Sequence, residues 1–169
     1  KEWFDKLRVL MKRRKGTDLA VLMGDMNTLA PSDGRFYEQE AVLEQLKSGP
    51  SLVRKFIHEG AIDYRPMQAL LGAGLIDVAA ATAGPHTTEL EHTVPTTSNT
   101  DHMHATHLRL DYFLANVRFM DAATMVRPRV QVLRSEVTNA LSDHFPIACE
   151  LVFSEKAGAG GAGSGGALG

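Results

Sequence analysis

The stretch Leu19-Ala-Val-Leu-Met-Gly-Asp-Met-Asn27 joins a short apolar run to two polar side chains. Residues 19–23 are continuously apolar, which is typical of a buried β-strand. In extended backbone, residues two apart face the same way. We therefore expect Asp25 and Asn27 to project together from the end of this strand, with Met26 turned back into the core.

Two interpretations of this polar pair remain open on the stretch alone. A carboxylate beside an amide can orient a water molecule and hold a phosphate oxygen. The pattern Gly-Asp-x-Asn is also typical of an Asx-type turn, in which the side chain of Asp25 only stabilises the exit from the strand.

Arg109-Leu-Asp111 lies inside a second apolar run, and residues 108–115 are predicted to form a strand. A charged side chain within a buried strand is costly unless it is paired. Arg109 and Asp111 would lie on one face of the strand, so a structural ion pair between them is one interpretation. A functional role for the carboxylate is the other.

Ser142-Asp143-His144 precedes a third strand, predicted over residues 147–153, in which Ile147 and Cys149 face one side. Adjacent Asp and His residues can form a turn. They can also supply a metal-binding carboxylate beside an imidazole that contacts phosphate. Each of these segments is inconclusive when taken alone.

Taken together and in this order, Gly24-Asp-Met-Asn27, Arg109-Leu-Asp-Tyr112 and Ser142-Asp-His-Phe-Pro146 resemble the closing motifs of the endonuclease/exonuclease/phosphatase superfamily, with its exonuclease III-like and deoxyribonuclease I-like fold. The resemblance spans residues 19–153. It implies an α/β fold, the C-terminal half of a four-layer α/β sandwich in which two packed mixed β-sheets are flanked by helices. It also implies a divalent-metal-dependent phosphoester hydrolase, similar to phosphodiesterases and nucleases.

The resemblance assigns a role to five residues of this sequence. Asp25 is similar to the family carboxylate that orients or deprotonates the attacking water, and Asn27 to the amide that holds the scissile phosphate. His144 is similar to the imidazole that contacts this phosphate, and Asp111 to the carboxylate that orients the imidazole. Asp143 is similar to a metal-site acid, for which Mg²⁺ or Mn²⁺ is the expected ion.

The sequence departs from the family pattern at its beginning. The N-terminal half of the family fold carries an early Asn and a metal-binding Glu, and nothing before Asp25 matches them, because Glu2 starts a predicted helix over residues 2–14. We therefore expect residues 1–156 to be the C-terminal portion of such a domain, with the missing N-terminal half of the same protein as its partner. These residues alone should be nearly inactive. A non-catalytic binding or assembly module derived from this fold is the alternative.

Composition narrows the class of protein. The net charge of −2 and the pI of about 6.4 show no basic excess, so nucleic acid is one candidate among several phosphoester substrates. The single cysteine, Cys149, excludes an internal disulfide, and no apolar run is long enough to span a membrane. These features favour an intracellular over a secreted protein. Residues 157–169, rich in Gly and Ala, are predicted to be a flexible tail.

Helices are further predicted over residues 37–47, 51–59 and 66–71, and strands over 75–79 and 130–133. Between them, residues 83–107 form a polar, histidine-rich segment without periodicity, typical of a functional loop. Its histidines leave three interpretations open, namely a solvated loop, a substrate rim and a zinc site. They are His86, His92, His102, His104 and His107.

Overall fold

The computed structural model describes residues 6, 9, 18–83, 91–98, 107–122 and 129–150. The strands are β1 (Val21–Asp25), β2 (Ile57–His58), β3 (Ala61–Ile62), β4 (Leu75–Asp77), β5 (Asp111–Asn116), β6 (Arg129–Val132) and β7 (Ile147–Glu150). The helices are the 3₁₀ turn η1 (Pro31–Asp33), α2 (Gly34–Tyr37), α3 (Glu40–Ser48), α4 (Pro50–Phe56), α5 (Arg65–Leu71), α6 (Val78–Thr82), α7 (Val117–Ala122) and α8 (Glu136–Leu141). Most of the helix predicted over 2–14, the end of the strand predicted over 147–153 and the tail at 157–169 lie outside the described residues.

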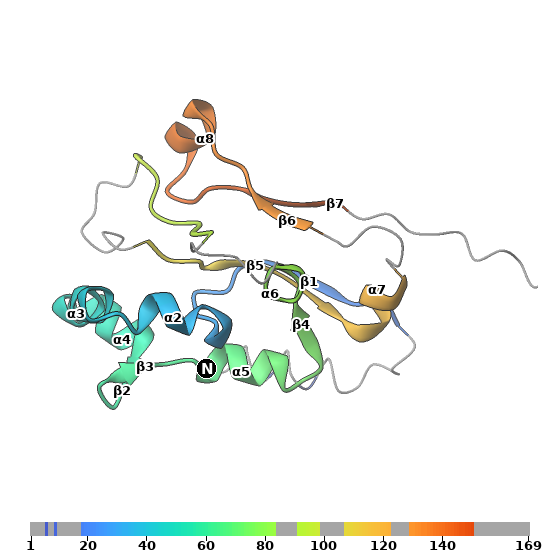
Figure 1. Cartoon of the computed structure of the whole chain (residues 1–169), viewed down its shortest axis with the longest axis horizontal. Coiled ribbons are helices and arrows are strands. Elements are labelled where there is room, and N and C mark those ends of the chain that lie inside the picture. Colours follow the sequence, from blue (N-terminus) through green and yellow to red (C-terminus); the bar gives the residue numbers. More distant parts are fainter. Residues whose placement is uncertain are drawn as a thin grey trace, which may run out of the picture.

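The strands form three small sheets, ordered β1-β5-β4, β2-β3 and β6-β7. Helices α2 to α5 lie on one side of the β1-β5-β4 sheet, and β6, β7 and α8 lie on the other (Figure 1). The predicted α/β class is confirmed. Every pairing among the described strands is antiparallel, and β5 runs opposite to both of its neighbours. The mixed sheets that we expected are therefore not found in this part of the chain.

The two faces of the β1-β5-β4 sheet bury different cores. One face packs Met26, Tyr112 and Leu114 against side chains of α5. The opposite face, which carries Phe113 and Ala115, packs against side chains of β6 and β7. Because side chains alternate along β5, this strand contributes to both cores and is buried on both sides.

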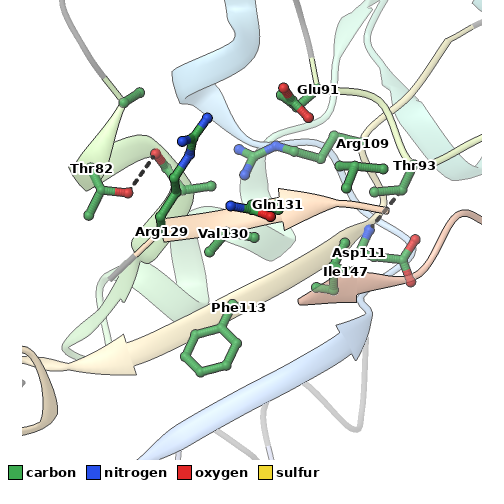
Figure 2. Close-up of a pocket in the computed structure, with 13 residues that line it drawn as sticks. Thr82, Glu91, Thr93, Arg109, Asp111, Phe113, Arg129, Val130, Gln131 and Ile147 are labelled. Carbon is green, nitrogen blue, oxygen red and sulfur yellow. Dashed lines mark hydrogen bonds between the residues drawn. The ribbon is translucent and has the colours of Figure 1, made fainter. Parts of the chain in front are cut away.

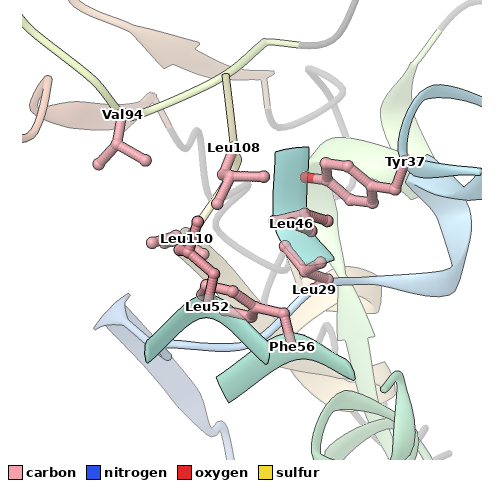
Figure 3. Packing of buried hydrophobic residues seen from close by; sticks show 8 residues of the cluster. All are labelled: Leu29, Tyr37, Leu46, Leu52, Phe56, Val94, Leu108 and Leu110. Carbon is pink, nitrogen blue, oxygen red and sulfur yellow. The ribbon is translucent and has the colours of Figure 1, made fainter. Parts of the chain in front are cut away.

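Helices α2 to α4 build a third core, which is drawn in Figure 3. Its buried members are Leu29, Tyr37, Leu46, Leu52, Phe56, Val94, Leu108 and Leu110. Leu29 lies two residues beyond Asn27, so the helices pack directly against the segment that follows β1. The helical insertion between β1 and β4, formed by α2 to α5, therefore helps to position the end of β1, where Asp25 and Asn27 lie.

The strand predicted over 108–115 begins at Asp111, and the helix predicted over 37–47 is divided into α2 and α3. Two further predicted boundaries are wrong for clear local reasons. Helix α4 ends at Phe56 rather than 59, because Glu59 and Gly60 adopt positive φ values of 51° and 82° and form the turn between β2 and β3. The strand predicted over 75–79 stops at Asp77. The side chain of Asp77 accepts a hydrogen bond from the backbone N of Ala80 and begins α6 instead.

Helices α7 and α8 were not predicted. Helix α8 begins with a capping box between Ser135 and Thr138, a signal that can be read from the sequence. It buries no residue, and Val137 and Leu141 are 65% and 75% exposed. Without a buried face, the helix leaves no apolar periodicity pointing to a core.

A buried ion cluster joins three distant segments at Arg109, which is 5% exposed. Its Nε donates to Oδ2 of Asp33 at 2.8 Å, and its Nη2 donates to Oδ2 of Asp77 at 2.6 Å. Burial opposes the charge on Arg109, but the two carboxylates together raise its pKa above the usual value. One of the two interpretations of the sequence, a structural ion pair between Arg109 and Asp111, is therefore wrong, because Arg109 pairs with Asp33 and Asp77 instead.

Replacing Arg109 by Met should cost about 3–5 kcal/mol of unfolding free energy, because Asp33 and Asp77 would remain buried without a counter-ion. Urea denaturation followed by circular dichroism measures this loss. Arg54→Met, at an exposed position of α4, is the matched control and should change stability by no more than about 0.5 kcal/mol. Equal, small losses in the two variants would contradict the structural role of the cluster.

Candidate active site

The pairing of β1 with β5 brings the first two candidate residues together. Asp25, the last residue of β1, is the register partner of Asp111, the first residue of β5. Partners that lie directly opposite in an antiparallel pair project from the same face of the sheet. The two carboxylates therefore stand side by side where β1 ends and β5 begins.

The turn after β1 holds Asn27 against Asp25. Oδ1 of Asp25 accepts from the backbone N of Asn27 at 2.8 Å, and its Oδ2 accepts from Nδ2 at 2.7 Å. Asn27 has a φ of 46°, in the left-handed region that Asn tolerates better than most residues. Met26 is 3% exposed, so the predicted arrangement is confirmed. The bond from the backbone N of Asn27 to Oδ1 of Asp25 also forms the Asx-type turn of the alternative interpretation. The same geometry is therefore compatible with the catalytic interpretation and with the structural one.

Asp111 accepts a hydrogen bond from His144, the next candidate residue. Nδ1 of His144 lies 2.7 Å from Oδ2 of Asp111. A pairing of Asp111 with the histidine, rather than with Arg109, is the arrangement that the family resemblance implies, and the contact between the two residues is confirmed. Asp25, Asn27, Asp111 and His144 are thus brought together from three separate parts of the chain.

Thr93, which the sequence did not single out, holds this pair in place from the segment between the strands. Its buried hydroxyl accepts from the backbone N of Leu110 at 3.0 Å and from that of Asp111 at 3.2 Å. Its carbonyl accepts from the backbone N of Phe145 at 2.8 Å. One threonine in a long polar segment carries no sequence signal, because its role depends on which strands it meets.

The electrostatics of the site raise two pKa values for different reasons. The pKa of His144 is raised by the hydrogen bond to Asp111, against the effect of burial, and further by the charges of Asp25 and Asp143. The pKa of Asp25 is raised by loss of water around its carboxyl group, while the N–H of Asn27 and the charge of His144 oppose the rise. The site thus favours a cationic imidazole beside a carboxylate of increased basicity.

Asp143 lies next to His144 and is exposed. The hydroxyl of Ser142 donates to Oδ1 of Asp143 at 3.2 Å and accepts from the backbone N of His144 at 3.2 Å. Through this serine the carboxylate is kept close to the imidazole whose pKa it raises. Its role as a metal ligand stays a prediction.

Some described side chains carry the oxygen donors that Mg²⁺ prefers, but the described residues do not form a full set of ligands. Carboxylates such as those of Asp25, Asp111 and Asp143 are the hard oxygen donors that Mg²⁺ and Mn²⁺ prefer. Among the residues that the structure describes, no group of three or more His, Cys, Asp or Glu side chains is arranged to hold a metal ion. Mg²⁺ commonly binds through one or two carboxylates and several waters, so Asp143 could supply one ligand of a site completed elsewhere.

Two histidines of the polar segment lie near the candidate site. The rings of His92 and His107 stack with centroids 3.9 Å apart, and His92 also meets the ring of Phe145 edge-on. Nη2 of Arg134 donates to the carbonyl of His92. His86, His102 and His104 lie outside the described residues, so the zinc and substrate-rim interpretations of this segment stay predictions.

A pocket of about 660 Å³ adjoins the candidate site between α6, β5 and β6 (Figure 2). Asp111 and Thr93 line it, whereas Asp25, Asn27 and His144 are not among its lining residues. The other polar side chains around it are Thr82, Glu91, Arg109, Arg129 and Gln131. The pocket therefore reaches the Asp111–His144 pair from the side of the carboxylate.

Comparison with the models of known protein families gives no match for this chain, and comparison with curated protein sequences gives none either. In the described part of the chain, no helix is both long and apolar enough to cross a membrane.

Asp111→Asn should lower the pKa of His144, because it removes the charge that holds the proton on the imidazole. An NMR titration of the His144 ring measures this change, with Asp121→Asn, an exposed position of α7, as the control. The folded-state pKa of His144 lies above its ordinary value of 6.5. The stability that the pair contributes is therefore complete below about pH 6.5 and is lost as the pH rises through the folded-state pKa. A His144 pKa that the substitution leaves unchanged would contradict this coupling.

Proposed function

We propose that this chain is the C-terminal half of a divalent-metal-dependent phosphoester hydrolase, similar to phosphodiesterases and nucleases of the endonuclease/exonuclease/phosphatase superfamily. The observation that carries the proposal is the hydrogen bond between Asp111 and His144, beside an Asp25 held opposite by the β1–β5 register. A structural turn requires no such meeting of two carboxylates, an amide and an imidazole from distant segments. The proposed hydrolysis of a phosphoester uses all four.

In the proposed reaction each side chain has one task. Asp25 orients the attacking water and accepts its proton, which its raised pKa favours. Nδ2 of Asn27 uses one N–H toward Asp25, so its second N–H is available to a phosphate oxygen. His144, kept cationic by Asp111, donates from Nε2 to the same phosphate. The water oxygen forms a bond to phosphorus as the ester P–O bond breaks, and the leaving oxygen departs with the electron pair of that bond and takes up a proton from solvent.

The proposed cofactor is Mg²⁺ or Mn²⁺. When bound, such an ion neutralises the charge that develops on the phosphoryl oxygens. In this proposal Asp143 is one of its ligands, and a Glu from the missing N-terminal half is another. The proposal also includes an intracellular location.

Exposed apolar side chains beside the site support the proposed partner. Leu19 is 52% exposed and Met23 is 62% exposed, although both belong to the apolar run that leads to Asp25. Met23 lies on the same face of β1 as Asp25, because the two residues are two positions apart in a strand. An N-terminal half that completes the proposed four-layer sandwich would cover them. A non-catalytic binding or assembly module remains the second candidate, since apolar side chains of this kind also suit a binding partner.

The protein extended at its N-terminus should hydrolyse at least one of four substrates with Mg²⁺ or Mn²⁺: abasic DNA, single-stranded RNA, sphingomyelin or an inositol phosphate. Asp25→Asn should lower its turnover by about 10²- to 10⁴-fold, because the general base is lost. Asp121→Asn should have little effect. Release of phosphate or of cleaved product measures the rates. Turnover unaffected by Asp25→Asn would rule out the proposed chemistry, and no turnover at all would favour the binding module.

The 169-residue chain alone should show little or no Mg²⁺-dependent turnover, because Asp143 by itself binds the ion weakly. Adding the N-terminal segment in trans should restore activity and protect Leu19 and Met23 from solvent. Hydrogen exchange at β1 measures this protection. Robust turnover by the chain as a monomer would show that the proposed division of the domain is wrong.

A further inference from the structure

Helix α4 brings a lysine to the candidate site. Nζ of Lys55 donates to Oδ1 of Asn27 at 3.3 Å. On the same helix, Leu52 and Phe56 are buried in the core that also contains Leu29 (Figure 3). Packing against Leu29 therefore fixes α4 beside the end of β1 and leaves the exposed Lys55 next to the amide.

The chemistry of the three groups fixes the orientation of the Asn27 amide. An ionised carboxylate only accepts hydrogen bonds and an ammonium only donates them. Nδ2 of Asn27 must then face Asp25, and Oδ1 must face Lys55, as the structure shows. The contact of Lys55 is long and uses one of its three N–H donors. No other hydrogen bond of this ammonium is found among the residues that the structure describes, so it retains donors for a ligand.

The charges around the site show why a ligand would use this lysine. Asp25, Asp111 and Asp143 place carboxylates around a site that is proposed to receive an anion. The nearby guanidinium of Arg109 is buried and already paired with Asp33 and Asp77, so it offers no free charge. Lys55 is exposed and hydrogen-bonded to the residue that would hold the phosphate.

We propose that Lys55 binds a non-bridging phosphate oxygen of the substrate, beside the second N–H of Asn27. This inference rests on the proposed function and adds to it a binding residue from the helical insertion between β1 and β4. An ammonium acts on phosphate as a compact point charge with rotatable donors, which suits a position at the exposed rim of a site.

Titration of the 169-residue chain with inorganic phosphate, followed by NMR of the Asn27 side-chain amide and the His144 ring, tests the proposal. Lys55→Met should weaken phosphate binding by about tenfold, the effect of losing one charged hydrogen bond. Lys55→Arg should keep the affinity within about threefold. Arg54→Met removes the neighbouring exposed cation of the same helix and is the matched control, with an expected change below about twofold.

The outcomes separate this proposal from the function on which it rests. If His144→Ala abolishes binding while Lys55→Met leaves it unchanged, the phosphate site stands and the role of Lys55 is overturned. If Lys55→Met and Arg54→Met weaken binding equally, only the general field of the helix matters and the specific role is again overturned. If phosphate shifts neither the Asn27 nor the His144 signal in the unaltered chain, both the proposed function and this inference are contradicted.

Discussion

A buried guanidinium holds the described part of this molecule together. Arg109 can be buried only because two carboxylates neutralise it, and they come from η1 and from the end of β4. The backbone N of Arg109 also donates to the hydroxyl of Tyr37 at 3.0 Å. The start of β5 is thereby tied at once to the segment after β1, to the helical insertion and to β4.

This constraint determines where the candidate site can form. Asp111 follows Arg109 by two residues and begins β5, so the ion cluster also positions this carboxylate. The β1–β5 register then sets Asp25 opposite, and Thr93 secures both Asp111 and the segment that carries His144. A site that depends on strand ends held in this way can keep its polar groups accessible while apolar cores on both faces of the sheet supply the stability.

A second consequence is that the charged groups that stabilise the fold are separate from those of the candidate site. Asp33 and Asp77 neutralise the charge of Arg109. Asp111 therefore pairs with His144 rather than with Arg109. The pKa of His144 rises through a direct hydrogen bond, whereas that of Asp25 rises through loss of water. A group that holds its proton and a group that accepts one more readily can therefore coexist in one site.

The sequence by itself determined the local features. The apolar run before Asp25, the burial of Met26 and the shared direction of Asp25 and Asn27 follow from the alternation of side chains along extended backbone. Which distant residue each charged or polar side chain contacts was decided by the tertiary structure. Asp111 with His144, Arg109 with Asp33 and Lys55 with Asn27 are 33, 76 and 28 residues apart in sequence. Backbone geometry governs which way a side chain points, but only the packing of strands and helices determines which distant charge it meets.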